Sequence, residues 1–267
     1  MKGSEPAITW PELLSFPLAG RNGKPRTKGV TMVIDKGLGL AETRDLLHLS
    51  GRYIDFLKLG FGTSALYAQE VLEEKIKLVR DYRVDIYPGG TFLEIAILQN
   101  KLKSFLYLAK SLGFTAIEIS DGTVRVSPDT RKNAINMARN LGFKVLTEVG
   151  KKDPKNSLSL ECLINQIKLD LEHGSQWVII EGRESGKEVG VYDKEGQFVK
   201  QALDTIISHH EFSEHLIWEA PLKHQQQDLI LRLGPNVNLG NISPTEILSV
   251  EALRVGLRGD TLVSLLK

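Results

Sequence analysis

Short apolar runs alternate with segments of helical periodicity along most of this chain. Eight of the runs have the length and the apolar, β-branched composition of buried strands. These predicted strands cover residues 30–35, 53–59, 84–87, 115–120, 143–149, 176–181, 216–219 and 237–239. Because most are continuously apolar rather than alternating, they fit a parallel sheet that is covered on both faces.

Helical periodicity fills the spaces between these strands. Apolar positions recur there at i, i+3, i+4 and i+7, as on one face of an amphipathic helix. The predicted helices cover residues 40–51, 65–82, 92–112, 128–141, 158–173, 197–209, 223–233 and 244–257. Ser127-Pro128 and Ser243-Pro244 supply an N-cap followed by proline at the first helical position.

Eight β/α units in one chain of 267 residues predict an α/β fold of the (β/α)8 TIM barrel class. A doubly wound open sheet is the alternative, but it normally has fewer strands. It would also need a phosphate-binding loop after the first strand, where the chain has only Lys36-Gly37-Leu38-Gly39. We therefore assign residues 29–267 to one barrel domain.

Residues 1–28 lack the alternation of strand and helix patterns, and we assign them to a short N-terminal extension. Its second half, residues 20–28, is basic and loop-like. The simplest interpretation is an arm in solvent. A cover over an active site, or an arm that reaches a neighbouring subunit, are the alternatives.

Composition excludes several classes of function. The formal net charge is only +1, so we expect no partner among nucleic acids or membrane surfaces. No apolar run approaches the ~20 residues of a membrane span. With one cysteine and no signal-peptide pattern, we expect a protein of the reducing cytoplasm.

Carboxylates stand where predicted strands end. Glu118, Glu148, Glu181 and Glu219 lie at the carboxyl ends of four strands, which is where TIM barrels place their active sites. Four carboxylates on adjacent strands repel one another unless a cation or protons neutralise them. Since no His or Cys stands at a strand tip, oxygen ligands predict Mg²⁺ rather than a softer metal.

Cations and glycines stand at the same ends. Lys58, Lys151, Lys152 and Arg183 could bind anionic groups. In Gly89-Gly90-Thr91 a helix begins, so backbone N–H groups there could bind phosphate. Further polar side chains at strand tips complete the candidate set: Asp35, Lys36, Ser120, Asp121, Glu184, Ser185 and Asn238. Each of these alone is often only a surface or structural ion pair, but their occurrence together predicts a metal-assisted site for anionic substrates.

At these residues the sequence resembles the phosphosulfolactate synthase family. The resemblance runs from about residue 28 to 262. Its motifs include Ile34-Asp35-Lys36-Gly37, Lys58-Leu59-Gly60-Phe61-Gly62-Thr63-Ser64, Tyr87-Pro88-Gly89-Gly90-Thr91, Glu118-Ile119-Ser120-Asp121-Gly122, Thr147-Glu148-Val149-Gly150-Lys151-Lys152, Glu181-Gly182-Arg183-Glu184-Ser185-Gly186, Glu219-Ala220-Pro221 and Val237-Asn238-Leu239.

The resemblance implies a TIM barrel that adds sulfite to phosphoenolpyruvate with Mg²⁺, giving (2R)-phospho-3-sulfolactate. It implies a carbon–sulfur lyase working in the synthetic direction, on a path toward coenzyme M or sulfolactate. It also implies a homo-oligomer, with a trimer as one form. The second lysine of the pair after strand five, Lys152, is where the resemblance places the proton donor, with Lys151 as the alternative. Gly240 departs from the alanine expected there.

Two other readings remain open. One is a different Mg²⁺-dependent barrel enzyme that acts on a phosphorylated enol or keto acid, such as an aldolase or isomerase. The other is a barrel without catalytic activity. Against a Schiff-base aldolase, the tip of strand six carries Glu181 and Arg183 rather than a lysine in an apolar setting.

Overall fold

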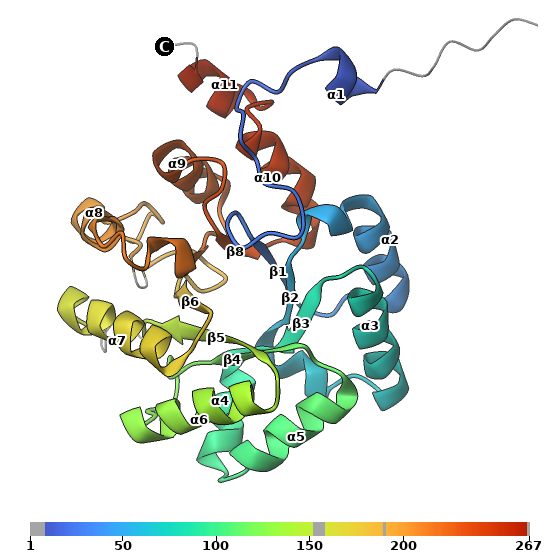
Figure 1. Cartoon of the computed structure of the whole chain (residues 1–267), viewed down its shortest axis with the longest axis vertical. Helices are drawn as coiled ribbons and strands as arrows, with labels where there is room; N and C mark the ends of the chain where they lie inside the picture. Colours follow the sequence, from blue (N-terminus) through green and yellow to red (C-terminus); the bar gives the residue numbers. More distant parts are fainter. Residues whose placement is uncertain (1–8, 152–157, 189–190, 266–267) are drawn as a thin grey trace, which may run out of the picture.

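A computed structural model describes residues 9–151, 158–188 and 191–265 of the chain. Within these residues, eight parallel strands form a nearly closed barrel with helices around it (Figure 1). The strands are β1 Thr31–Asp35, β2 Phe56–Leu59, β3 Asp85–Pro88, β4 Ala116–Ile119, β5 Lys144–Val149, β6 Trp177–Ile180, β7 Leu216–Glu219 and β8 Leu239–Ile242. The (β/α)8 prediction is confirmed.

The strands pair in the order β3-β2-β1-β8-β7-β6-β5-β4. Between the two end strands, β3 and β4, Thr115 donates from its backbone N–H to the carbonyl oxygen of Ile86 at 3.1 Å. The N–H of Ile86 donates in return to the Thr115 hydroxyl at 3.0 Å. These two bonds connect β3 with β4, the two end strands of the sheet.

Two apolar layers hold the barrel. Inside it, a small cluster packs on itself, with Met32, Phe56, Tyr87, Leu146 and Ile217 among its members. Outside it, the opposite faces of the strands pack against the surrounding helices in one large core. Because side chains alternate along a strand, the residues two positions beyond the inner cluster also face inward, at the carboxyl end.

The helices follow the prediction with two main differences. The α-helices are α1 Trp10–Leu13, α2 Leu40–Ser50, α3 Gln69–Asp81, α4 Gly90–Leu98, α5 Leu102–Leu112, α6 Pro128–Asn140, α7 Leu160–His173, α8 Lys200–Ser208, α9 Lys223–Leu233, α10 Ile247–Arg254 and α11 Gly259–Leu265. The 3₁₀ helices are η1 Gly51–Tyr53, η2 Gly60–Ala65, η4 Ser213–His215 and η5 Pro244–Glu246.

The first difference concerns the predicted helix 92–112, which is two helices, α4 and α5. Asn100 between them has φ +56°, a left-handed conformation that ends a right-handed helix and that asparagine tolerates. The second concerns 65–82, where the helix starts only at Gln69, because η2 covers the first residues.

The last strand was predicted too early, at 237–239, and runs over Leu239–Ile242 instead. Gly240 sits inside it, where a Cβ would come within 2.7 Å of Cε of Met32. The close approach of Met32 and Ile217 leaves no room for a side chain there, so the departure from alanine has a steric reason.

The N-terminal arm is bound at the other end of the barrel, where the strands begin. Arg21 pairs with Glu251 at 2.6 Å, and Arg26 pairs with Asp55 at 3.0 Å with its own side chain 2% exposed. Lys24 donates to two backbone carbonyl oxygens there. Residues 21–26 are therefore neither an arm in solvent nor a cover over the strand tips.

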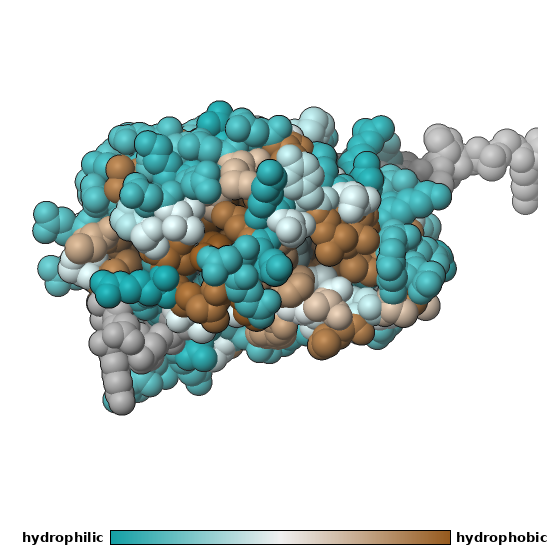
Figure 2. Space-filling model, turned by 90° about the horizontal axis from the view of Figure 1, so that it is seen from below, coloured by the Kyte–Doolittle hydropathy of each residue, from teal (hydrophilic) through white to brown (hydrophobic). Residues whose placement is uncertain are grey.

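One outer face of the barrel is apolar. On α4 and α5, Ile95, Leu98, Tyr107 and Leu108 are 42%, 66%, 55% and 60% exposed. Figure 2, which views the molecule from below, shows apolar side chains gathered on this side. We call these four residues the α4/α5 apolar patch.

Candidate active site

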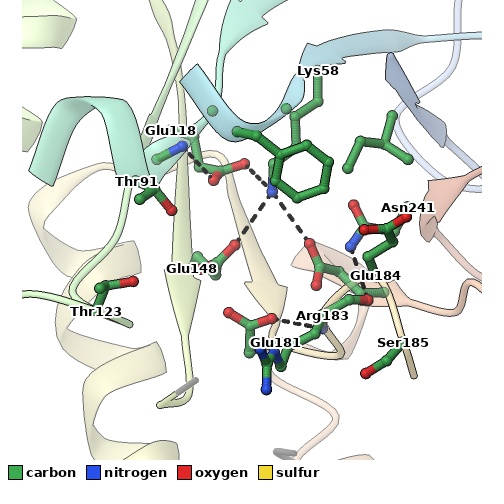
Figure 3. A pocket seen from close by; sticks show the side chains of 16 residues that line it. Lys58, Thr91, Glu118, Thr123, Glu148, Glu181, Arg183, Glu184, Ser185 and Asn241 are labelled. Carbon is green, nitrogen blue, oxygen red and sulfur yellow. Dashed lines mark hydrogen bonds and ion pairs between the residues drawn. The ribbon is translucent and has the colours of Figure 1, made fainter. Parts of the chain in front are cut away.

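A pocket of about 350 Å³ opens at the carboxyl ends of the strands (Figure 3). Its lining comes from the tips of all eight strands or the loops that follow them, which is the usual position of a TIM-barrel active site. The lining residues are Ile34, Lys58, Gly60, Phe61, Gly89, Gly90, Thr91, Glu118, Thr123, Glu148, Glu181, Arg183, Glu184, Ser185, Glu219 and Asn241. Eleven of them are among the residues singled out from the sequence.

The four predicted carboxylates converge on this pocket. Glu118, Glu148 and Glu219 belong to β4, β5 and β7, and Glu181 directly follows β6. Four consecutive strands, β4 to β7, therefore each contribute an acidic group, and all four residues are 1% exposed. Their inward direction follows from the alternation of side chains, because each stands two positions after an apolar residue of the inner cluster, such as Leu146 before Glu148.

Lys58 lies among these carboxylates. Its ammonium nitrogen is 2.9 Å from Oε2 of Glu118 and 3.3 Å from an oxygen each of Glu148 and Glu219. Burial alone would lower the pKa of Lys58, but these three carboxylates outweigh it and raise the pKa well above its ordinary value. Lys58 is therefore a permanent cation inside the acidic cluster.

Glu118 shows the opposite shift. Burial raises its pKa to about 7, against the lowering effect of Lys58 and with a further rise from Glu148 and Glu219. A carboxyl group with this pKa exchanges its proton near neutral pH. Within the site, Glu118 is thus an acidic group able to change its charge near neutral pH.

The other three carboxylates form the arrangement best suited to a metal. Glu148, Glu181 and Glu219 each offer one oxygen, and these oxygens all lie within 4.8 Å of one another. All three side chains are buried, which makes their negative charges costly without a cation. A set of oxygen ligands only is the donor set of a hard divalent cation such as Mg²⁺.

The start of α4 differs from the phosphate site predicted there. The N–H of Gly90 donates to Oε1 of Glu118 at 2.7 Å, and the N–H of Gly89 donates to the carbonyl of Leu59 at 3.0 Å. These two amides are thus engaged within the chain, and the prediction that they are free for phosphate is wrong. Glycine at position 90 is still required, since a Cβ would come within 2.6 Å of Glu118.

The tip of β6 is tightly folded. The N–H of Arg183 donates to Oε1 of Glu181 at 2.6 Å. A Cβ on Gly182 would lie 2.6 Å from the carbonyl oxygen of Glu219, so only glycine fits between these two strands. This turn brings Arg183 into the lining of the pocket as its principal cation apart from Lys58.

The loop after β4 is fixed by a residue that the sequence did not single out. Glu94 of α4 is fully buried and accepts hydrogen bonds from the hydroxyl of Ser120 and the N–H groups of Gly122, Thr123 and Val124. Ser120 therefore serves this contact and does not line the pocket. An acidic residue inside an otherwise apolar helix was the available signal for Glu94.

Lys151 is bound beside the pocket rather than in its lining. Its ammonium group donates to Asp121, at 2.5 Å to the carboxylate and 2.6 Å to the backbone carbonyl. Asp121 in turn lies 3.4 Å from Arg131, a buried residue of α6. Lys152, the predicted proton donor, lies outside the described residues.

Three further candidates are placed elsewhere. Asp35 points away from the pocket and pairs with Lys75 of α3. Lys36 pairs with Glu184 at the rim. Asn238 lies before β8, at the opposite end of the barrel, where it bonds the backbone of residues 29–30, 214 and 216. The prediction that Asn238 binds an anion is therefore wrong, because it followed from a strand placed two residues too early.

The pocket also includes residues that were not predicted for it. They are Ile34, Gly60, Phe61, Thr123 and Asn241. Asn241 is the eighth-strand residue that does reach the site. A correct boundary for β8 alone would place Asn241 on the outer face with Leu239, and the left-handed φ of +53° at Asn241 interrupts this alternation.

Comparison with known proteins identifies the family of this chain. The model of the (2R)-phospho-3-sulfolactate synthase (ComA) family matches residues 19–260. The chain belongs to this family. It is 47% identical to the phosphosulfolactate synthase of Methanocaldococcus jannaschii, over 88% of this chain and 94% of that protein. It is 45% identical to that of Methanothermobacter thermautotrophicus, over 91% and 94%. The resemblance read from the motifs is confirmed.

Solved structures support the fold alone. A crystal structure of KGPDC from Streptococcus mutans superimposes with a TM-score of 0.54 at 12% identity, over 89% of this chain and 99% of that one. In the described part of the chain, no helix combines the length and the apolar character that a membrane span requires.

Proposed function

We propose that this chain is a phosphosulfolactate synthase that adds sulfite to phosphoenolpyruvate with Mg²⁺, giving (2R)-phospho-3-sulfolactate. The observation that carries the proposal is the group of Glu148, Glu181 and Glu219 beside Arg183 in one pocket. A chain of this family with that pocket has both a place for a divalent cation and a cation for an anionic substrate. The reaction makes a carbon–sulfur bond and so belongs to the lyases run in the synthetic direction.

The residues fit a magnesium ion. Glu148, Glu181 and Glu219 would hold it through one oxygen each, and substrate oxygens or water would complete its shell. Lys58 brings a single positive charge to four buried carboxylates, so a divalent cation would offset much of the remaining negative charge. When bound, Mg²⁺ would supply positive charge that offsets the negative charge developing on the substrate.

The chain's own residues handle the anions. Arg183 would bind the phosphate or sulfite group through its planar guanidinium. Thr91, at the start of α4, lies on another side of the same pocket. With both anions held in the pocket, the sulfur lone pair of sulfite can form a bond to carbon 3 of phosphoenolpyruvate.

Formation of that bond pushes the electrons of the double bond toward carbon 2 and the carboxylate. Lys58 keeps a fixed positive charge close to this region. A proton must then reach carbon 2, because the product carries hydrogen there and keeps its phosphate. We assign this transfer to Lys152, with Lys151 held aside by Asp121.

The test is an assay of the purified protein. Phosphoenolpyruvate, sulfite and Mg²⁺ should be consumed together, followed by the loss of the ultraviolet absorbance of the enol phosphate. Chelation by EDTA should stop the reaction, and added Mg²⁺ should restore it. Loss of the enol phosphate without sulfite would instead favour an aldolase- or isomerase-type barrel enzyme, and no turnover at all would favour a barrel without catalytic activity.

We further propose that the protein acts in the cytoplasm as a homo-oligomer that buries the α4/α5 apolar patch. The exposure of Leu98 and Leu108, at 66% and 60%, supports such a contact. Light scattering of the wild type and of a Leu98→Glu/Leu108→Glu variant tests it. The variant should be smaller in solution, and an unchanged mass would contradict this interface.

A further inference from the structure

Two residues at the tips of β6 and β8, the strands on either side of β7, have a left-handed backbone. Arg183, after β6, has φ +56°, and Asn241, in β8, has φ +53°. Both line the pocket. Left-handed conformations are uncommon for residues with a side chain, and they concentrate at functional sites.

A hydrogen bond joins these two residues across β7. Nδ2 of Asn241 donates to the backbone carbonyl of Arg183 at 3.2 Å. The N–H of Arg183 donates on its other side to Glu181 at 2.6 Å. The backbone of Arg183 is thus held at both its N–H and its carbonyl, and Figure 3 shows Asn241 and Arg183 on the same side of the pocket.

Among the described residues, the side-chain amide of Asn241 makes no hydrogen bond other than the one to Arg183. Asn241 is 5% exposed, and its Oδ1 has no hydrogen-bond partner among the described residues. A buried polar atom without a partner costs about 1–3 kcal/mol. Glycine would adopt this φ more easily. The side chain is therefore useful for its contact with Arg183.

We propose that Asn241 is a positioning residue that fixes the Arg183 turn, so that the guanidinium of Arg183 is held ready for an anionic substrate. This inference rests on the proposed function for the identity of the anion. Because its backbone is fixed, the side chain of Arg183 has fewer orientations available at the strand tip. Less ordering is then required when the anion binds, which strengthens binding without any contact between Asn241 and the anion.

The variant Asn241→Gly separates this contact from backbone strain, because glycine accepts the left-handed conformation and removes only the side chain. Asn100→Gly is the matched control: Asn100 has φ +56° but is exposed between α4 and α5, outside the pocket lining. Hydrogen exchange of the peptide spanning residues 182–186 should speed up about tenfold in Asn241→Gly and stay unchanged in Asn100→Gly. Equal exchange in the two variants would overturn the inference, whether or not the protein makes phosphosulfolactate.

Kinetics provide the second readout. Asn241→Gly should raise the KM for phosphoenolpyruvate about tenfold and change kcat by less than about twofold. In an Arg183→Ala background, the same substitution should add less than about a twofold effect, because the residue through which it acts is gone. An effect of the same size in both backgrounds would overturn the positioning role. A wild-type protein without sulfite-dependent turnover would contradict the proposed function, and the exchange experiment would still decide the role of Asn241.

Discussion

The ammonium nitrogen of Lys58 lies 2.9 Å from Oε2 of Glu118, inside a pocket where both side chains are almost fully buried. This pair joins β2 to β4 across the barrel mouth. It keeps one positive charge among the carboxylates before any ligand binds. The lysine thus offsets part of the negative charge of the cluster in which we propose a divalent cation.

We predict that Lys58→Met lowers kcat/KM at least about 100-fold, since the proposed reaction uses the fixed charge of Lys58 in this pocket. It should also lower the free energy of unfolding by about 3–5 kcal/mol, because buried carboxylates lose their partner. Urea unfolding and the sulfite assay measure the two effects. The control is Lys223→Met, whose pair with Asp260 is 45% and 32% exposed and should matter little.

Adding Glu118→Gln to Lys58→Met extends this prediction. The double variant should recover part of the stability, because one of the unpaired carboxylates is gone, and should recover none of the activity. Recovery of both properties would mean that Lys58 serves only to balance Glu118.

The two lysines after β5 should differ in effect. We expect Lys152→Ala to abolish sulfite-dependent turnover while the protein stays folded, because the proposed proton donor is removed. Lys151→Ala should lower kcat by about tenfold or less, since the Lys151 ammonium is bound to Asp121. Circular dichroism confirms the fold, and the assay compares the variants. If Lys151→Ala is the more severe change, the proton donor has been misassigned.

The lack of a side chain at position 90 leaves room for the carboxylate of Glu118. A Cβ there would lie 2.5 Å from the Ser120 hydroxyl and 2.6 Å from Glu118. We predict that Gly90→Ala displaces Glu118 and lowers kcat/KM about 10- to 100-fold. Gly259→Ala is the control, because a Cβ at that position meets nothing within 4 Å and should leave activity unchanged. Equal activity of both variants would contradict a role for the Gly90 contact.

The sequence predicted the barrel well because its signal is repeated in every unit. Each strand is a short apolar run and each helix has its own period, so an error at one boundary leaves the others intact. The four glutamates could be placed for a related reason. Glu148 follows Leu146 by two positions on a strand, and this alternation alone directs both side chains into the barrel.

Predictions that depended on a single boundary or on tertiary contacts failed. Asn238 was predicted for the site because β8 was placed two residues early, whereas the strand begins at Leu239 and leaves Asn238 at its amino end. The engaged amide of Gly90 and the burial of Glu94 arise from contacts between α4 and the strand β4. No local pattern reports contacts of that kind.

Behind β5, a buried ion pair supports the site from the helix layer. Arg131 of α6 binds Asp170 of α7 at 2.6 Å and donates to the backbone carbonyl of Glu148 at 2.9 Å. We predict that Arg131→Met lowers the free energy of unfolding by about 3–5 kcal/mol, because it leaves Asp170 buried without its cation. Arg232→Met, which breaks an exposed pair with Asp228, should cost less than about 1 kcal/mol. Urea unfolding compares them, and equal losses would contradict the assignment.

The ionisation of Lys24, in the N-terminal arm, makes the free energy of unfolding depend on pH. Burial lowers its pKa from 10.5 to about 8, with a further lowering by Arg26 and an opposing effect of Asp55. Between pH 8 and pH 10.5 the folded chain has released this proton while the unfolded chain still holds it, so the free energy of unfolding rises with pH. Lys24→Met lacks this titration, and its own pH dependence supplies the reference.

The stability of the wild type relative to Lys24→Met should therefore rise by about 1–2 kcal/mol between pH 8 and pH 10.5, a value reduced for the partial exposure of Lys24. Thermal or urea unfolding of both proteins across this range measures the difference. A difference that stays constant would show that Lys24 keeps its ordinary pKa, and one that falls with pH would mean that its charged form is favoured. In either case the arm would be held to the barrel by the ion pairs of Arg21 and Arg26 rather than by a buried neutral lysine.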